Sequence, residues 1–461
     1  MHKLLFLFLP LFILGCNEKS SDTCDISPSS GEQARNEIFL ASSTTLKERP
    51  MLVIRLQYTD KKFVSDEDVW YNILFGNKKG ELNHYYHEIS NGQFGFKPVA
   101  NAGNVRNGIV TVNRNIAHPD PNIDSPNFEH KLHPELQIAI KSISDNNFDF
   151  SVYDINKDKF ITPDELVIIY IMAGEEEAYS GNINAVPGIW AHELCTRSTY
   201  TPKANGVSLL GCSEDGSYTI FGERHHDSDK KSHNATVGII AHELGHGAFD
   251  LPDLYASGIG SYGLMGFGSW GRTSSDNKAG SWPTHMTAWS KIDVGWFSAQ
   301  KKHSDTTSFV ELTATGSDQY NIIKSPIYNA PNEYFLLENR GMLGYDEGLK
   351  DVNSDYLGGI AIWHIDETNL KNSREANTVN ANVHHKEIDI EEAAGSSVDK
   401  GNGKGNPVTN LYYSSNVDAF TPNTSPNTDI YNGGKSYIFF TDISSVGTVM
   451  SLKINNPKEA P

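Results

Sequence analysis

The most informative string in the chain is His242-Glu243-Leu244-Gly245-His246, inside a segment, 236–249, whose apolar residues recur at helical spacing. On a helix, residues four apart lie on one face, so both imidazoles can reach one zinc ion. The ion would lower the pKa of its bound water towards about 7, and Glu243 is placed to take the proton. Apolar neighbours put the pair near a core, where idle imidazoles would be costly. The segment therefore predicts a zinc centre with Glu243 as the general base.

A catalytic tetrahedral zinc site needs a third protein ligand, and two aspartates follow the predicted helix. Asp250 lies on the same helical face as the histidines, but two turns, or about 12 Å, beyond His242. Asp253 follows Pro252, which ends a helix and lets the chain turn back towards the metal. We expect His242, His246 and Asp253 to hold the ion, with Asp250 as the alternative third ligand. Either carboxylate could instead be a loop residue or a helix cap.

A second pattern of ion ligands runs from position 154 to position 165. Its oxygen donors stand in the order of an EF-hand loop: Asp154, Asn156, Asp158, the carbonyl of Phe160, Thr162 and Glu165. Lys159 replaces the usual glycine at the sixth position, so we expect a strained turn there. The loop leads directly into an apolar run, which favours a structural calcium ion over an ordinary acidic loop.

Composition narrows the class of protein. The chain has 461 residues, of which 38% are apolar and 10% aromatic, so it can bury a sizeable core and is not a disordered protein. It has 38 basic and 57 acidic residues, and the net charge of −19 argues against a nucleic-acid partner. Such a balance favours cations or an extracellular setting.

The N-terminus has the layout of an export signal. In residues 1–16, MHKLLFLFLPLFILGC, a basic residue precedes a short apolar run and a Gly-Cys pair. The ending is similar to a lipoprotein box, in which Cys16 would carry a lipid anchor; plain signal cleavage is the alternative. The polar stretch 17–49 reads as a tether or a short pro-segment. We therefore expect an exported protein, either secreted or a lipoprotein of the bacterial outer membrane or cell surface, with the lipid as its one membrane contact.

Export also bears on the four cysteines. In an oxidising compartment Cys195 and Cys212 can pair across a short loop, whereas two free buried thiols are less expected there. Cys24 is then left over, and the sequence assigns it no role.

The chain divides by its pattern into two regions. The first, 50–304, mixes expected strands and helices, which predicts an α+β domain. The strands are expected at 51–58, 166–172 and 218–221, and the helices at 82–89, 132–143 and 236–249. The second, 305–461, has short β-type runs between Gly, Asn, Asp and Ser loops, which predicts an all-β sandwich.

Several stretches together resemble one family of proteins. They are, in chain order, 83–96 (NHYYHEISNGQFGF), 153–165, the His-Glu-x-x-His string with 251–255 (LPDLY), 263–270 (GLMGFGSW), 288–296 (AWSKIDVGW), 334–340 (YFLLENR), 359–366 (GIAIWHID) and 391–393 (EEA). This pattern is similar to the immune inhibitor A family of secreted bacterial zinc metallopeptidases, which are metzincin-like enzymes. The resemblance covers most of the chain.

The resemblance implies a metzincin-like catalytic domain and a methionine turn under the metal, here at Met265. In the family pattern, His-Glu-x-x-His-x-x-Gly-x-x-Asp, a glycine turns the chain towards the third ligand. This chain departs from it, with Phe249 at the glycine position and Pro252 at the ligand position. An insertion of one residue restores the alignment on Asp253. Tyr262 is a further candidate for reaching the metal, and His192-Glu193 has no second histidine and reads as structural.

These expectations combine into a zinc-dependent endopeptidase that acts on proteins or peptides, with the substrate paired to an edge strand near Tyr218–Phe221. One alternative is a zinc amidase that acts on cell-wall peptides, although no glycan-binding module is recognisable. Another is a non-catalytic surface adhesin with a relic zinc helix, although a relic need not keep its glutamate.

Overall fold

The computed structural model describes residues 36–42, 45–180, 187–226, 231–255, 258–302, 307–399 and 403–456. The predicted signal segment 1–16 with Cys16, and also Cys24, lie outside the described residues. No helix in these ranges is both long enough and apolar enough to cross a membrane.

A mostly parallel sheet forms the first part of the fold. Its strands are β2 (Lys47–Gln57), β3 (Phe94–Pro98), β4 (Ile109–Asn113), β6 (Val167–Glu176), β7 (Gly188–Ile189), β8 (His192–Leu194), β11 (Tyr218–His226) and β12 (Ser232–Asn234). β2, β6 and β11 run parallel at its centre, while β8 and β12 pair antiparallel with β11. A small separate sheet contains β5 (Phe160–Ile161), β9 (Lys203–Ala204) and β10 (Val207–Leu209).

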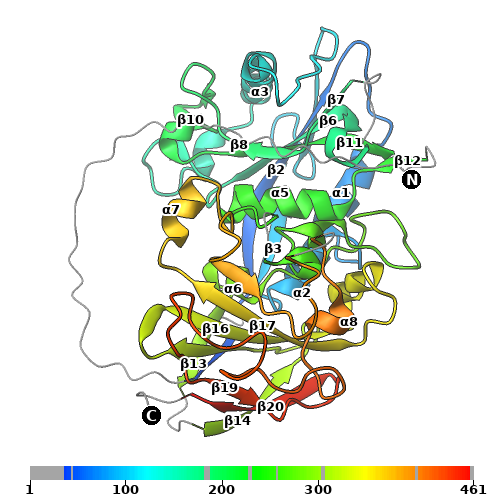
Figure 1. Ribbon diagram of the computed structural model, residues 1–461. Coiled ribbons are helices and arrows are strands. Elements are labelled where there is room, and N and C mark those ends of the chain that lie inside the picture. Colours follow the sequence, from blue (N-terminus) through cyan, green and yellow to red (C-terminus); the bar gives the residue numbers. More distant parts are fainter. Residues whose placement is uncertain are drawn as a thin grey trace. The chain divides into compact units, whose positions relative to one another are not determined.

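Helices cover both faces of this sheet, which explains why its central strands are apolar at almost every position. Along β2, Met51 and Val53 face one core and Leu52 and Ile54 face the other, as the two-residue period of a strand requires. The first core contains α5 (Val237–Phe249) and the second contains α3 (Phe128–Asp145), on opposite sides of the sheet (Figure 1). The remaining helices are α1 (Glu67–Phe75), α2 (Leu82–Ile89), α4 (Glu177–Ser180), α6 (Ala288–Asp293), α7 (Leu370–Glu375) and α8 (Pro407–Asn410).

The prediction that residues 218–221 form a free edge of the sheet is wrong. Tyr218, Thr219 and Ile220 pair with β8, so that stretch of β11 is covered on both sides. The covering strand has three residues and is too short to show a period of its own in the sequence. The outer edge of the sheet at this point is therefore β8.

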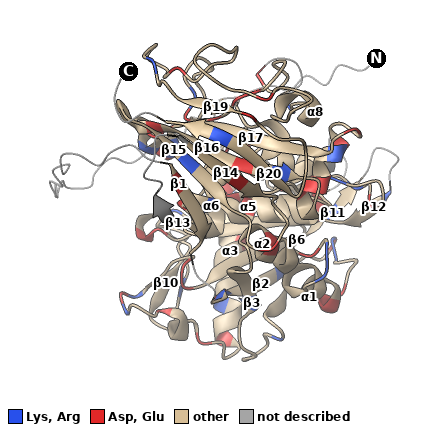
Figure 2. Ribbon diagram, turned by 90° about the horizontal axis from the view of Figure 1, so that it is seen from below, with Lys and Arg blue, Asp and Glu red and all other residues tan. Residues whose placement is uncertain are grey.

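The second half of the chain adds two more sheets. One runs in the order β13 (Phe297–Lys302), β1 (Glu37–Ala41), β15 (Ile322–Ile327), β16 (Ala330–Gly341), β17 (Gly358–Asp366) and β18 (Ile388–Ile390). The other contains β14 (Thr307–Thr313), β20 (Val449–Asn455) and β19 (Phe439–Thr441). Figure 2 shows β14 and β20 against β15–β17, and side chains from both sheets form a common core.

The sheets cross both boundaries expected from the sequence. β1 and the start of β2 lie in the stretch 17–49 that reads as a tether, so part of it belongs to the fold. β1 also pairs with β13 and β15, on either side of residue 304. Alternate residues of β16 pack in opposite directions, with Leu336 in the core of α5 and Leu337 in the core shared with β14. Residues 305–461 therefore do not close on themselves as a separate sandwich, and residues 34–461 form one compact mixed α/β unit.

Candidate metal centre

Helix α5 holds the two histidines of the central string on one buried face. Thr236 stands at its N-cap, and the helix runs through Phe249, as the apolar spacing predicts. The Nδ1 atom of His242 lies 2.9 Å from the carbonyl oxygen of Leu264, and that of His246 lies 2.6 Å from that of Leu251. A carbonyl can only accept, so both Nδ1 atoms carry the hydrogen and both Nε2 atoms present lone pairs. The protein has thus selected the tautomer that binds a metal.

The end of α5 shows how the one-residue insertion is accommodated. Asp250 adopts the left-handed conformation (φ 54°, ψ 31°), and its N–H donates to the carbonyl of His246. Glycine adopts this conformation most easily. Phe249 stands where the family pattern has glycine, and the turn occurs one residue later, at Asp250. The side chain of Asp250 is 97% exposed and pairs with Arg374. Asp250 is a helix cap directed away from the histidines, and the alternative third ligand is not supported.

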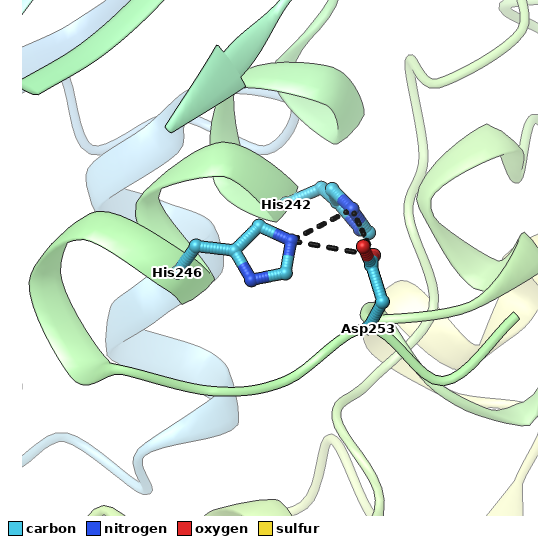
Figure 3. Close-up of side chains that lie close together, drawn as sticks. All are labelled: His242, His246 and Asp253. Atoms are coloured by element: carbon cyan, nitrogen blue, oxygen red, sulfur yellow. Dashed lines mark hydrogen bonds and ion pairs between the residues drawn. The ribbon is translucent and has the colours of Figure 1, made fainter. Parts of the chain in front are cut away.

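Asp253 returns to the histidines after this turn (Figure 3). Its Oδ1 lies 3.3 Å from Nε2 of His242 and 3.3 Å from Nε2 of His246, and the two Nε2 atoms are themselves 3.3 Å apart. In a tetrahedral complex with bonds of about 2.0–2.1 Å, donor atoms lie about 3.3 Å from one another. The three donors therefore fit a small cation of nitrogen and oxygen preference. Within the described residues this is the one group of three His, Cys or acidic side chains that is so close.

The electrostatics of the three side chains agree with this geometry. Burial opposes ionisation of Asp253, but the neighbouring imidazoles of His242 and His246 hold the pKa of its carboxyl well below the usual range. Burial lowers the pKa of His246, yet the adjacent carboxylate of Asp253 outweighs it and raises that pKa to about 10. A positive charge is thus favoured at the centre of the group, and a bound cation would take the place of the proton.

Glu243 lies on α5 beside this group and is buried. Burial raises the pKa of its carboxyl, while the two histidines and the nearby backbone N–H of Glu193 lower it. A raised pKa suits a group that must accept and return a proton near neutral pH. Glu193 belongs to β8, so this strand lies beside the helix that carries the predicted general base.

Met265 packs against α5 between the two histidines. A Cβ atom added at Gly245 would lie 2.4 Å from its sulfur, which shows how closely the thioether approaches the helix. The backbone N–H of Leu254 donates to the carbonyl of Met265 at 2.8 Å, next to the carbonyl of Leu264 that accepts from His242. This short segment thus contacts both the helix and the loop that carries Asp253.

Tyr262 does not reach the group. Its hydroxyl is buried and donates to Asn410 Oδ1 at 2.9 Å. The tyrosine that does approach is Tyr255, whose ring centre lies 5.3 Å from that of His242 and whose hydroxyl lies 3.5 Å from that of Ser269. In the sequence, Tyr255 stands two residues after Asp253, but this closeness along the chain does not show where the ring points.

The predicted calcium loop is closed by its last acidic residue. The carboxylate of Glu165 accepts the backbone N–H groups of Ile155 and Thr162 at 2.9 and 3.2 Å. Lys159 has φ 73°, the left-handed conformation that glycine usually supplies at this position of the loop. Asp154 Oδ1 is buried and has no hydrogen-bond partner. The backbone therefore follows an EF-hand-like turn, and the calcium ion itself stays a prediction.

Beyond β8, Cys195 and Cys212 form a disulfide bond with their Cα atoms 4.9 Å apart. At the start of β8, Nδ1 of His192 donates to the carbonyl of Trp190 and Nε2 lies 3.2 Å from the hydroxyl of Tyr218. His192 is thus a structural residue, whereas its neighbour Glu193 packs against Gly247 of α5.

A buried histidine pair and a carboxylate, with a glutamate at their side, are the parts of a metal-dependent hydrolase. The model of one protein family, described as immune inhibitor A peptidase M6, catalytic domain, matches residues 51–297. That is more than half of the chain, and the protein belongs to this family of metallopeptidases. It is a peptidase whose substrates are proteins or peptides.

Among solved structures, wild-type OgpA from Akkermansia muciniphila shares 14% identity at a TM-score of 0.30, over 64% of this chain and 73% of that chain. The catalytically inactive OgpA in complex with an O-glycopeptide (glycodrosocin) substrate shares 13% identity at a TM-score of 0.31, over 64% and 72%. Similarity at this level supports no conclusion about the function of this chain. A search of curated proteins finds no match.

Proposed function

We propose that this protein is a zinc-dependent endopeptidase that hydrolyses peptide bonds of proteins, with His242, His246 and Asp253 as zinc ligands and Glu243 as the general base. The observation that carries the proposal is the triangle of three donor atoms, each 3.3 Å from the other two. Two of these are imidazole nitrogens, which zinc binds well and which calcium and magnesium avoid. Met265 under the helix supports a metzincin-like arrangement of the catalytic region 50–304.

Each residue has a role in the proposed reaction. Zinc, when bound, supplies an acidified water and polarises the scissile carbonyl. Glu243 takes the proton of the attacking water and later returns it to the leaving amine. Leu264 and Leu251 hold the imidazoles through their carbonyl oxygens, so the donors stay oriented without rearrangement.

The substrate pairs, in this proposal, with the outer edge of β8 rather than with β11. An extended peptide can add to an exposed sheet edge through main-chain hydrogen bonds. β8 lies beside Glu243 through Glu193, so a peptide on this edge would run past the general base.

We also propose a structural calcium ion at Asp154, Asn156, Asp158, the carbonyl of Phe160, Thr162 and Glu165. The left-handed Lys159 and the orphaned Asp154 oxygen support it. Calcium should raise the thermal unfolding midpoint of the wild type, and the increase should disappear in Glu165→Gln. An equal increase in that variant would contradict the site.

Export of the protein is a further proposal, since it rests on the sequence of residues 1–16. The lipid anchor on Cys16 is its specific form, and mass spectrometry of the mature N-terminus would test it. A mature chain that begins after Cys16 would exclude the anchor.

The enzymatic proposal is tested with Glu243→Gln and the control Asp250→Asn. Glu243→Gln should keep stoichiometric zinc by elemental analysis but lose casein cleavage by at least about a hundredfold, because the proton acceptor is gone. Asp250→Asn should keep both. Unchanged cleavage by Glu243→Gln would refute the base assignment. Cleavage of cell-wall peptides without casein would favour the amidase, and a zinc-free wild type without activity would favour the adhesin.

A further inference from the structure

Glu176, the last residue of β6, holds three separate segments with one side chain. Its Oε1 accepts the backbone N–H groups of Ala178 and Ala191 at 3.0 and 2.9 Å, and its Oε2 accepts that of Gly222 at 2.8 Å. The donors belong to α4, to the residue before β8, and to β11. The side chain is fully buried.

A carboxylate at this place is costly, because three neutral N–H groups replace its water shell and, within the described part of the chain, no cation pairs with it. Burial raises the pKa of this carboxyl to about 8, against the three N–H groups that lower it, and the charge of Glu243 raises it further. We therefore expect this buried carboxyl group to have a role beyond packing.

The contacts of Glu176 lead to the general base in two short steps. Glu176 fixes the N–H of Ala191, and β8 begins at the next residue. Two residues after Ala191, Glu193 packs against α5, since a Cβ atom added at Gly247 of that helix would lie 3.1 Å from its Cγ, and its backbone N–H lies near enough to Glu243 to lower the pKa of that carboxyl. The far end of β8 is held by the Cys195–Cys212 disulfide and by the N–H of Thr196, which donates to Leu210.

We propose that Glu176 is a positioning residue for the general base: its carboxyl group fixes the start of β8 so that the backbone of Glu193 stays beside α5 and Glu243. The proposal rests on the proposed function of Glu243. None of the hydrogen bonds of Glu176 reaches the three metal donors or the substrate.

The test compares Glu176→Gln with Glu223→Gln. Glutamine has one acceptor oxygen, so its NH₂ faces either the N–H of Gly222 or those of Ala178 and Ala191, and this repulsion displaces the side chain from its place between the three N–H groups. Glu223 is a matched control, because it is equally buried on β11 and also accepts backbone N–H groups, from Val64 and Ser65 at 2.9 and 2.8 Å. Its contacts hold the loop before α1 rather than β8.

Hydrogen exchange followed by mass spectrometry gives a readout that needs no activity. In Glu176→Gln, amides of a peptide over 188–196 should exchange at least tenfold faster, while those of β2 keep the wild-type rate. In Glu223→Gln the faster exchange should appear at 62–66 instead. Wild-type protection of 188–196 in Glu176→Gln would overturn the proposal.

Kinetics give the second readout. With zinc content equal to the wild type, Glu176→Gln should lose at least tenfold in kcat, with a smaller change in KM, and Glu176→Asp should recover part of the loss. Glu223→Gln should keep kcat within about twofold of the wild type. Equal losses of kcat in both Gln variants would contradict the proposal, because Glu176 would then only stabilise the fold. A wild type without peptidase activity would instead refute the proposed function. The exchange experiment would then show only whether Glu176 holds β8 in place.

Discussion

At the scale of single residues, the third donor depends on one backbone conformation. Asp250 takes the left-handed turn that the family pattern gives to glycine, and this allows Asp253 to meet the histidines despite the extra residue. The sequence predicted Asp253 from the position of Pro252, but the helix already ends at Phe249, before the proline. The turn therefore comes from Asp250, and Pro252 only follows it.

Asp250→Gly and Asp253→Asn should separate the two aspartates. Glycine removes the left-handed strain, so Asp250→Gly should keep the metal and change the free energy of unfolding by no more than about 1 kcal/mol, in the stabilising direction. Asp253→Asn should lose zinc, because a neutral amide binds it poorly. Elemental analysis and urea unfolding check both variants. Zinc loss in Asp250→Gly with retention in Asp253→Asn would reverse the assignment.

His118 should make the protein sensitive to acid. Its imidazole is buried, its Nδ1 accepts the N–H of Asp120, and burial lowers its pKa from 6.5 to about 4. Between pH 6.5 and 4 the unfolded chain therefore binds a proton that the folded chain does not, so stability is full above pH 6.5 and falls as the pH approaches 4. Asparagine can supply the same acceptor without titrating.

Urea unfolding at pH 6.5 and pH 4.5 would measure the effect of His118→Asn. We expect the variant to lose about 2 kcal/mol less than the wild type over this interval. An identical loss in both proteins would show that His118 does not contribute to the acid sensitivity.

At the scale of elements, long periodic segments were predictable and short ones were not. The helices expected at 82–89 and 236–249 match α2 and α5 closely, because their apolar spacing is carried by the local sequence. β8 has three residues, and its pairing partner β11 is more than twenty residues away. Its position follows from Glu176, from Tyr218 and from the disulfide, none of which is a local signal.

Removing the disulfide should release β8 from its far end. Cys195 and Cys212 are 17 residues apart, and opening a loop of this size costs about 3 kcal/mol of unfolding free energy. The Cys195→Ser, Cys212→Ser double variant should lose about that much in urea unfolding and should cleave casein more slowly. Unchanged stability and cleavage would show that other contacts suffice to hold the strand.

At the scale of the whole molecule, both halves of the chain share one core. Arg340 on β16 is fully buried, with its Nε 2.7 Å from Asp346 and its Nη1 donating to the carbonyl of Tyr262. Lys291 of α6 pairs with Glu338 of β16 at 2.8 Å, also fully buried. Separating such pairs leaves uncompensated buried charges, so residue 304 is not a point at which the fold can be divided.

A fragment of residues 50–304 should therefore fail to fold by itself. It would expose the face of α6 that packs on β16, together with Tyr262 and Trp289. We expect no cooperative thermal transition and strong binding of a hydrophobic dye, whereas a chain of residues 34–461 should unfold cooperatively. A cooperative transition in the shorter fragment would restore the boundary expected from the sequence.

The sequence alone determined the two histidines, their glutamate and the helix that carries them, because a spacing of four residues on a helix is a local property. It also indicated the family, through stretches spread along most of the chain. Tertiary structure decided the rest of the centre: which aspartate joins the histidines, which tyrosine approaches them, and which strand lies beside Glu243. These depend on a left-handed turn and on pairings between distant segments, whose energies are settled only when the core closes.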